Sequence, residues 1–120
     1  MTKKEKQTTY VERDVSWMYF NHRILQEAEK PTVPLLERLS FLGIYSNNLD
    51  EFFRVRVASR NRLVENESLP ERHRKTIRKT LKTINRLNEE YSNEYTKVIR
   101  KVAAELEEHH VRLLKETQLN

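Results

Sequence analysis

The chain has 120 residues, a length that favours a single domain with a modest core. Its net charge of +5 favours an attraction for anionic partners. It has no cysteine, so disulfide bonds and cysteine-ligated metal sites are excluded, and no apolar run approaches the ~20 residues that a membrane-spanning helix needs. One glycine and three prolines leave few places for turns, so the elements are expected to be long helices.

Residues 1–14 are mostly polar and charged, with Tyr10 and Val11 as the only anchors, and they predict an N-terminal arm that has no apolar signal segment. Ser16 is a favoured helix N-cap, and apolar residues follow it at helical spacing: Trp17, Phe20, Ile24 and Ala28. Pro31 disfavours helical geometry in the residue before it, so this helix is expected to end by Lys30. The prediction is a short first helix.

The longest apolar run lies in the middle of the chain and is interrupted by three polar residues that begin at Ser46. The apolar spacing of three and four residues stops at this break and resumes after it. Asn48 followed by Glu51 matches a capping-box signal for a new helix. We therefore expect one helix ending near Tyr45 and another from Asn47 or Asn48 to about Glu65, with a single bent helix as the alternative.

A fourth helix is predicted after a short connection at residues 66–69, where Ser68 and Glu71 form another capping-box pair. Its apolar positions alternate spacings of four and three residues, which is typical of a heptad seam. The seam consists of Ile77, Leu81, Ile84, Asn88, Tyr91, Tyr95, Val98 and Val102. The helix is expected to reach about His109.

A helix of this length would span ~60 Å and needs a partner of similar length. The segment before it supplies that partner if it folds back antiparallel. The expected fold is all-α: an antiparallel hairpin of long helices with an additional short N-terminal helix, which makes a bundle of three to four helices. The helical domain is expected to cover residues 15–110.

Residues 10–65 also carry polar, aromatic and basic positions at fixed spacing, among them the motif SNNLDEFFRVRVA. Through these positions, residues 10–65 resemble the N-terminal domain of bacterial polyphosphate kinase, the family that makes polyphosphate from ATP. The matching positions are Ser16, Trp17, Phe20, Asn21, Arg23, Leu25, Glu27, Ala28, Pro34, Leu35, Glu37, Arg38, Phe41, Leu42, Ser46, Asn48, Leu49, Asp50, Glu51, Phe52, Phe53, Val55, Arg56 and Ala58.

The resemblance implies that Asn48 is the nucleotide-binding residue of this domain. A carboxamide offers one acceptor and two donors, which suits an adenine edge with its N–H₂ donor beside a ring-nitrogen acceptor. The alternative from the residues alone is that Asn48 only caps the following helix. In that case the side-chain oxygen is less free for a base, unless Asn47 takes over the cap.

The charged neighbours of Asn48 have structural interpretations as well. Asp50 and Glu51 could suggest an acid–base pair, but acidic residues at this position are better explained as stabilising the positive end of the predicted third helix. Arg54 and Arg56 are candidates for steering phosphate, although their spacing places them on different faces of the helix.

Two further pairs belong to the matched positions. One of Phe52 and Phe53 is expected in the core, and the other under a base or against a neighbouring domain. Asn21 and Arg23 are expected to be exposed on the first helix, in contact with another domain.

The four histidines do not form a site by spacing. His109 and His110 diverge by ~100° on a helix, and Glu105 with His109 falls short of the ligands that zinc requires. In the family the phosphorylated histidine, its arginines and its metal belong to later domains. No catalytic or metal-binding residue is therefore expected here. Residues 111–120 are expected to lead into those absent domains.

The function implied by the resemblance is that of a nucleotide-capping domain in an enzyme that reversibly transfers the γ-phosphoryl group of ATP to polyphosphate. The isolated domain is expected to be inactive. ATP would be the substrate, with Mg²⁺ held elsewhere in the full-length enzyme. Expected partners are ATP or ADP, polyphosphate and the other domains of the same polypeptide. Homo-oligomerisation is left open, and the expected location is cytoplasmic, with membrane association through the full-length enzyme also left open.

A basic series on the fourth helix supports a second candidate function. It comprises Arg72, His73, Arg74, Lys75, Arg78, Lys79, Lys82 and Arg86. Such a series attracts polyanions, but it is also typical of a solvated helix face. The alternative is therefore a non-enzymatic helical interaction module that pairs with protein through the heptad seam or with nucleic acid through the basic face. With the kinase function, no nucleic acid is expected.

Overall fold

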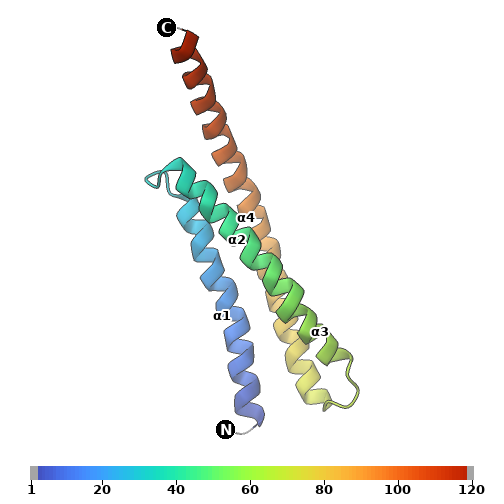
Figure 1. Cartoon of the computed structure of the whole chain (residues 1–120). Coiled ribbons are helices and arrows are strands. Elements are labelled where there is room, and N and C mark those ends of the chain that lie inside the picture. Colours follow the sequence, from blue (N-terminus) through green and yellow to red (C-terminus); the bar gives the residue numbers. More distant parts are fainter. Residues whose placement is uncertain (1–2, 119–120) are drawn as a thin grey trace.

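The computed structural model describes the backbone of residues 3–118 and the side chains of residues 12–110, 112, 114 and 115. Apart from the connections at residues 30–34 and 66–70, the described residues are helical, and they contain no strand. The elements in order are α1 (Lys3–Glu29), α2 (Leu35–Phe52), the π-helix η1 (Phe53–Val57), α3 (Ala58–Glu65) and α4 (Glu71–Gln118). The molecule measures 73 × 24 × 19 Å, and the prediction of an all-α bundle is confirmed (Figure 1).

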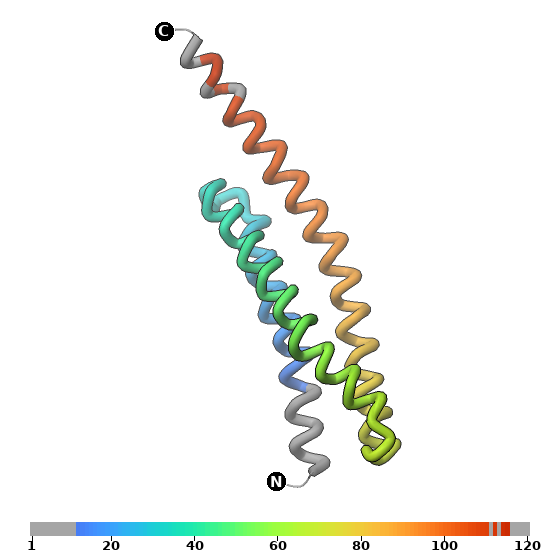
Figure 2. Tube along the Cα trace, turned by 45° about the vertical axis from the view of Figure 1, so that its right-hand side comes forward, coloured from blue at the N-terminus to red at the C-terminus, as the bar shows by residue number. Residues whose placement is uncertain are grey.

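The helices α2, η1 and α3 follow one another without a break and run antiparallel to α4 across a short connection (Figures 1 and 2). This is the predicted long-helix hairpin. The first helix packs along both arms of the hairpin. Near the α1–α2 connection the bundle ends, and the last part of α4 extends beyond it alone (Figure 2).

The first helix is longer than predicted, with 27 residues rather than a short segment after Ser16. It begins at Lys3, so the predicted arm is helical from that residue on, and the predicted N-cap at Ser16 is wrong. Lysine, glutamate and glutamine have good helix propensity, and no glycine or proline interrupts the segment. The helix ends at Glu29, just before Pro31, as predicted.

The middle of the chain is one continuous helix, so the predicted break at Ser46 is wrong, and the alternative of a single helix through this region is confirmed. Tyr45 and Phe52, on either side of the polar residues, are both buried on the core side of the helix. Their burial favours one uninterrupted helix over the local capping signal. The irregular turn lies further on, in η1, where the amide of Ala58 donates to the carbonyl of Phe53 five residues back.

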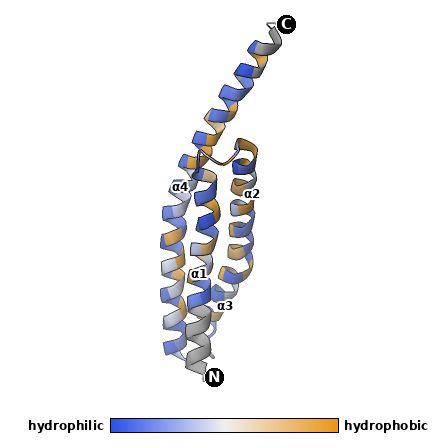
Figure 3. Ribbon diagram, turned by 90° about the vertical axis from the view of Figure 1, so that its left-hand side faces the viewer, coloured by the Kyte–Doolittle hydropathy of each residue, from blue (hydrophilic) through white to orange (hydrophobic). Residues whose placement is uncertain are grey.

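The heptad seam of α4 lies in the core as predicted. The seam residues Leu81, Ile84, Tyr91, Val98 and Val102 are buried, and Ile77 and Tyr95 pack against them. Apolar residues of α4 accordingly gather along the side that faces the other helices (Figure 3). No helix within the described residues is both long enough and apolar enough to cross a membrane.

The ends of α4 differ from the prediction. Pro70, rather than Ser68, stands at the N-terminal end, and its carbonyl accepts hydrogen bonds from the amides of His73 and Arg74. The helix also continues past the predicted end at His109, as far as Gln118. Residues 111–118, predicted as a tail, therefore extend the same helix.

Candidate functional site

Asn48 lies in the interior of α2 and is half-buried. Its Nδ2 donates to Oδ1 of Asn21 on α1 at 3.3 Å, and Nδ2 of Asn21 donates to the carbonyl of Tyr45 at 3.2 Å. The cap interpretation is wrong because no helix begins at Asn48. A carboxamide has two donors and one acceptor, so this contact orients the Asn48 side chain and uses one of its donors.

A cavity of about 250 Å³ opens beside Asn48, between α1 and the continuous α2–η1 helix. We call it the Asn48 cavity, and it is lined by Trp17, Asn48, Glu51, Phe52, Val55 and Arg56. The rings of Trp17 and Phe52 stack with their centroids 4.1 Å apart and their planes within 4°. The cavity therefore combines flat aromatic side chains with the oriented amide of Asn48 and one charge of each sign.

The lining residues of α2 and η1 follow helical spacing, from Asn48 through Phe52 to Arg56. Val55 and Arg56 belong to the π-helical turn itself. Single π-turns inside α-helices frequently occur at functional sites, and this one lies against the cavity. The eight-residue spacing of Asn48 and Arg56 is enough to predict that they share one face of a helix. Nothing in the spacing predicts the π-turn.

The two phenylalanines take different positions. Phe52 is 4% exposed and belongs to the core, as predicted for one of the pair. Phe53 is partly buried and meets the Phe52 ring edge-on, with the centroids 5.9 Å apart and the planes at 79°. Phe53 thus packs against the core rather than lining the cavity.

The charged residues near Asn48 are distributed differently from the prediction. Asp50 and Glu51 lie inside a continuous helix, so the interpretation that they stabilise a helix N-terminus is wrong. Asp50 pairs with Arg54 on the exposed surface at 3.6 Å. Glu51 and Arg56 instead line the cavity. The prediction that Arg54 and Arg56 face different sides is thereby confirmed.

Asn21 is 1% exposed, so the predicted exposed position is wrong, whereas Arg23 is exposed as predicted. The reason is the register of α1: its buried face is formed by Asp14, Met18, Asn21, Leu25 and Ala28. These residues alternate spacings of four and three, so the sequence does contain the signal for this buried face. The prediction instead chose the face that contains Phe20, which is 59% exposed.

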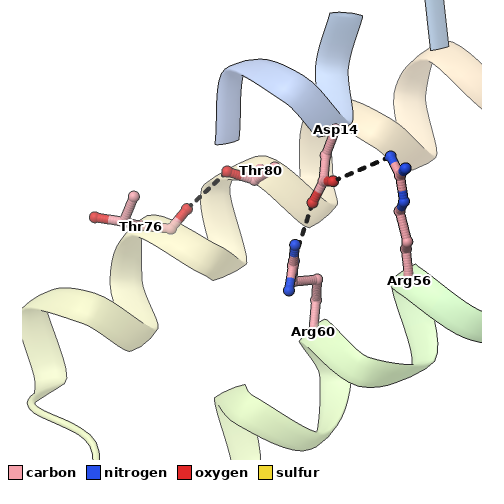
Figure 4. A network of polar contacts seen from close by, with 5 residues as sticks. All are labelled: Asp14, Arg56, Arg60, Thr76 and Thr80. Atoms are coloured by element: carbon pink, nitrogen blue, oxygen red, sulfur yellow. Dashed lines mark hydrogen bonds and ion pairs between the residues drawn. The ribbon is translucent and has the colours of Figure 1, made fainter. Parts of the chain in front are cut away.

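Asp14 anchors a second polar group that sequence reasoning missed, since it was assigned to the arm. Its side chain is 4% exposed and lies between two arginines of the opposite helix (Figure 4). The Nε of Arg60 donates to Oδ2 at 3.0 Å, and a terminal nitrogen of Arg56 lies 3.8 Å from Oδ1. On α4, beside this group, the Thr80 hydroxyl donates to the carbonyl of Thr76 at 3.1 Å (Figure 4).

Another polar cluster joins α1 to α4 near the middle of the bundle, formed by His22, Glu29, Tyr91 and Glu94. We call it the His22 cluster. The imidazole stacks on Tyr91 with the centroids 3.9 Å apart, and its Nε2 lies 2.7 Å from a carboxylate oxygen of Glu94. Within the described part of the chain, no three His, Cys, Asp or Glu side chains form a group that could hold a metal ion.

The two carboxyl groups of the His22 cluster have opposite pKa shifts. Burial, and then the hydrogen bond and charge of Glu94, raise the pKa of Glu29 to about 7. Burial also opposes ionisation of Glu94, but its hydrogen bonds with Glu29 and His22 outweigh that effect and lower its pKa. The proton shared by the pair therefore resides on Glu29.

The basic series of α4 is partly engaged in local ion pairs. Arg74 lies 2.8 Å from a carboxylate oxygen of Glu71, and Arg78 binds the other oxygen of the same side chain. These pairs lie in the first turns of α4.

Comparison with known proteins places this architecture in a family. Residues 10–114 match the family model described as the polyphosphate kinase N-terminal domain. The chain belongs to the polyphosphate kinase family. The match covers the whole Asn48 cavity, the Asp14 group and the His22 cluster.

Curated relatives agree with the family match. The chain is 42% identical to the polyphosphate kinase of Vibrio parahaemolyticus over 97 residues, which cover 78% of this chain and 14% of the relative. It is 41% identical to that of Vibrio cholerae over 119 residues and 36% identical to that of Escherichia coli over 114 residues, covering 92% of this chain and 16% of each relative. The chain thus spans about a sixth of these relatives' length. No solved structure matches.

Proposed function

We propose that this chain is the nucleotide-binding domain of a polyphosphate kinase that reversibly transfers the γ-phosphoryl group of ATP to polyphosphate. The observation that supports this function is the position of Asn48, whose amide is held by Asn21 at the edge of a cavity lined by stacked aromatic rings. The named relatives, polyphosphate kinases at 36–42% identity, supply the reaction.

Base recognition would depend on the chemistry of the amide. The Asn48 oxygen would accept from the adenine N–H₂ group, and the Asn48 N–H not bonded to Asn21 would donate to the neighbouring ring nitrogen. Trp17, which stacks on the buried Phe52 ring, would offer apolar contact to a planar base at the wall of the cavity. The Asn21 contact keeps the amide in one orientation before the base arrives, which lowers the entropic cost of binding.

The chemical step would take place outside this chain. His22 is partly buried, bonded to Glu94 and stacked on Tyr91, so it is poorly placed to accept a phosphoryl group. Within the described residues, no three His, Cys, Asp or Glu side chains come together as a metal-binding group. We therefore assign base recognition to this domain and assign the phosphoryl-transfer chemistry and the metal to the rest of the enzyme.

The test is steady-state kinetics of the intact enzyme that carries this domain, with Asn48→Ala compared with Asn47→Ala. Asn47 is the exposed neighbour and does not line the cavity, so it is a matched control. Losing one or two net hydrogen bonds to adenine should lower kcat/KM for ATP by roughly 2- to 100-fold, mainly through KM. Discrimination against GTP should shrink as well, because guanine reverses the donor and acceptor at this edge. Unchanged ATP kinetics in Asn48→Ala would contradict the proposal.

A further inference from the structure

A second cavity of about 440 Å³ adjoins the Asn48 cavity. We call it the arginine cavity, and it is lined by Arg13, Asp14, Ser16, Trp17, Phe20, Arg56 and Arg60. The two cavities share Trp17 and Arg56. A ligand whose flat end lies beside Asn48 would therefore have its other end directed past Arg56 toward this second hollow.

The charges of the arginine cavity do not cancel. Three arginines line it with a single carboxylate, Asp14, which is buried and lies closest to Arg60 at 3.0 Å. Arg56 is more distant at 3.8 Å, with 47% of its side chain exposed. Arg13 is exposed and forms no ion pair with any residue whose side chain the structure describes. The hollow therefore keeps a net positive charge.

The geometry suits an anion with several oxygens. A guanidinium presents its N–H groups as a planar fork that matches phosphate oxygens, and Arg is the usual residue for such recognition. Asp14 restrains Arg56 and Arg60 from one side, so their guanidinium groups are positioned before a ligand arrives. The Ser16 hydroxyl supplies an additional donor at the same cavity.

We propose that the arginine cavity binds the phosphate groups of a condensed phosphate chain. Two sources share this chemistry: the phosphates of a nucleotide whose base lies in the Asn48 cavity, and a separate oligophosphate. The first source rests on the proposed base-binding function. The second does not, since it needs only the arginines. The basic series of α4 is a weaker candidate for the same anion because its Arg74 and Arg78 already pair with Glu71.

The protein carries its own reporter for both cavities, because Trp17 is its one tryptophan and lines each of them. The experiment titrates the 120-residue chain with inorganic tripolyphosphate and follows Trp17 fluorescence, with calorimetry as an independent measurement. The test variant is Arg13→Gln, whose side chain is exposed and whose loss should not unfold the chain. The matched control is Arg100→Gln, the same change of charge at an exposed position of α4 outside both cavities.

We expect saturable binding of tripolyphosphate that weakens roughly tenfold or more in Arg13→Gln, as for loss of a charge-assisted hydrogen bond. Arg56→Gln should weaken it similarly, whereas Arg100→Gln should change it little. Either equal weakening by Arg13→Gln and Arg100→Gln, or no saturable binding by fluorescence and calorimetry, overturns the proposal. Equal weakening would mean that only the overall positive charge attracts the anion.

Competition identifies the source of the phosphate. If the nucleotide's own phosphates fill the arginine cavity, tripolyphosphate should displace ATP but not adenosine. If a separate chain fills it, tripolyphosphate and ATP should bind together. Both results support a phosphate site. Asn48→Ala separates this proposal from base recognition: it should leave tripolyphosphate affinity unchanged, and its effect on adenosine tests the Asn48 cavity alone.

Discussion

The Asn48 cavity and the His22 cluster both place polar side chains of α1 against another helix, but they differ in what those side chains contact. In the His22 cluster the imidazole, the Tyr91 ring and two carboxyl groups bind one another. At Asn48 a single contact to Asn21 orients the amide, and the side chain still borders an open hollow. Polar groups that satisfy one another stabilise the bundle, whereas an oriented polar group beside a hollow remains available to a ligand.

Both regions depend on the packing of α4, and the largest expected effect comes from disturbing that packing. Leu81→Ala removes a buried side chain of the heptad seam and should lower the free energy of unfolding by ~2–5 kcal/mol. Lys79→Ala, at an exposed position of the same helix, should stay within about ±0.5 kcal/mol. Urea or thermal melts measure both values, and equal losses would mean that the seam does not carry the core.

Replacing His22 tests whether its cluster is structural. His22→Ala removes the stack on Tyr91 and leaves the Glu94 carboxylate without its imidazole partner, so it should cost about 1–3 kcal/mol of stability. Nucleotide and tripolyphosphate affinities of the folded variant should be unchanged. If ligand affinity fell while the free energy of unfolding did not change, the His22 cluster would have a role in ligand binding and not the structural role assigned to it.

A smaller effect is expected from pH, through Glu29. Its pKa is raised from 4.5 to about 7 in the folded chain, so ionising it there costs stability. This penalty is absent below pH 4.5, grows between pH 4.5 and 7, and is complete above 7. Glu29→Gln removes the penalty, and the variant should therefore gain stability relative to the parent at pH 8 but not at pH 4.5.

Urea melts of Glu29→Gln and of the parent at these two pH values measure this difference in stability. The lowered pKa of Glu94 contributes stability that is lost as the pH falls below about 4.5, outside this window. An advantage of the glutamine variant that is the same at both pH values would show that Glu29 does not hold the proton.

Local signals predicted the parts of the fold that depend on neighbouring residues. Pro31 ended α1, and the alternation of four and three residues along α4 identified its buried side. The same kind of signal misled at Asn48, where a capping-box pattern was overridden by the burial of Tyr45 and Phe52. Tertiary packing outweighs a cap, which is worth only about 1 kcal/mol.

The candidate site was predicted only in part. The motif identified Asn48, but its partner Asn21 was assigned to the surface because Phe20 was assigned to the buried face of α1. The ion pair of Asp14 with Arg60 joins residues 46 positions apart. No spacing rule relates such residues, since only the packing of α1 against the continuous helix that contains α2 and α3 brings them together.

The most direct test of the Asn48 cavity is the affinity of the 120-residue chain for adenosine, which carries the base without phosphates. Calorimetry should compare the parent, Asn48→Ala and Asn47→Ala, each shown by melts to be folded. We expect the dissociation constant to rise roughly 2- to 100-fold in Asn48→Ala and to stay unchanged in Asn47→Ala. Equal adenosine affinity in all three proteins would show that the Asn48 amide does not read the base.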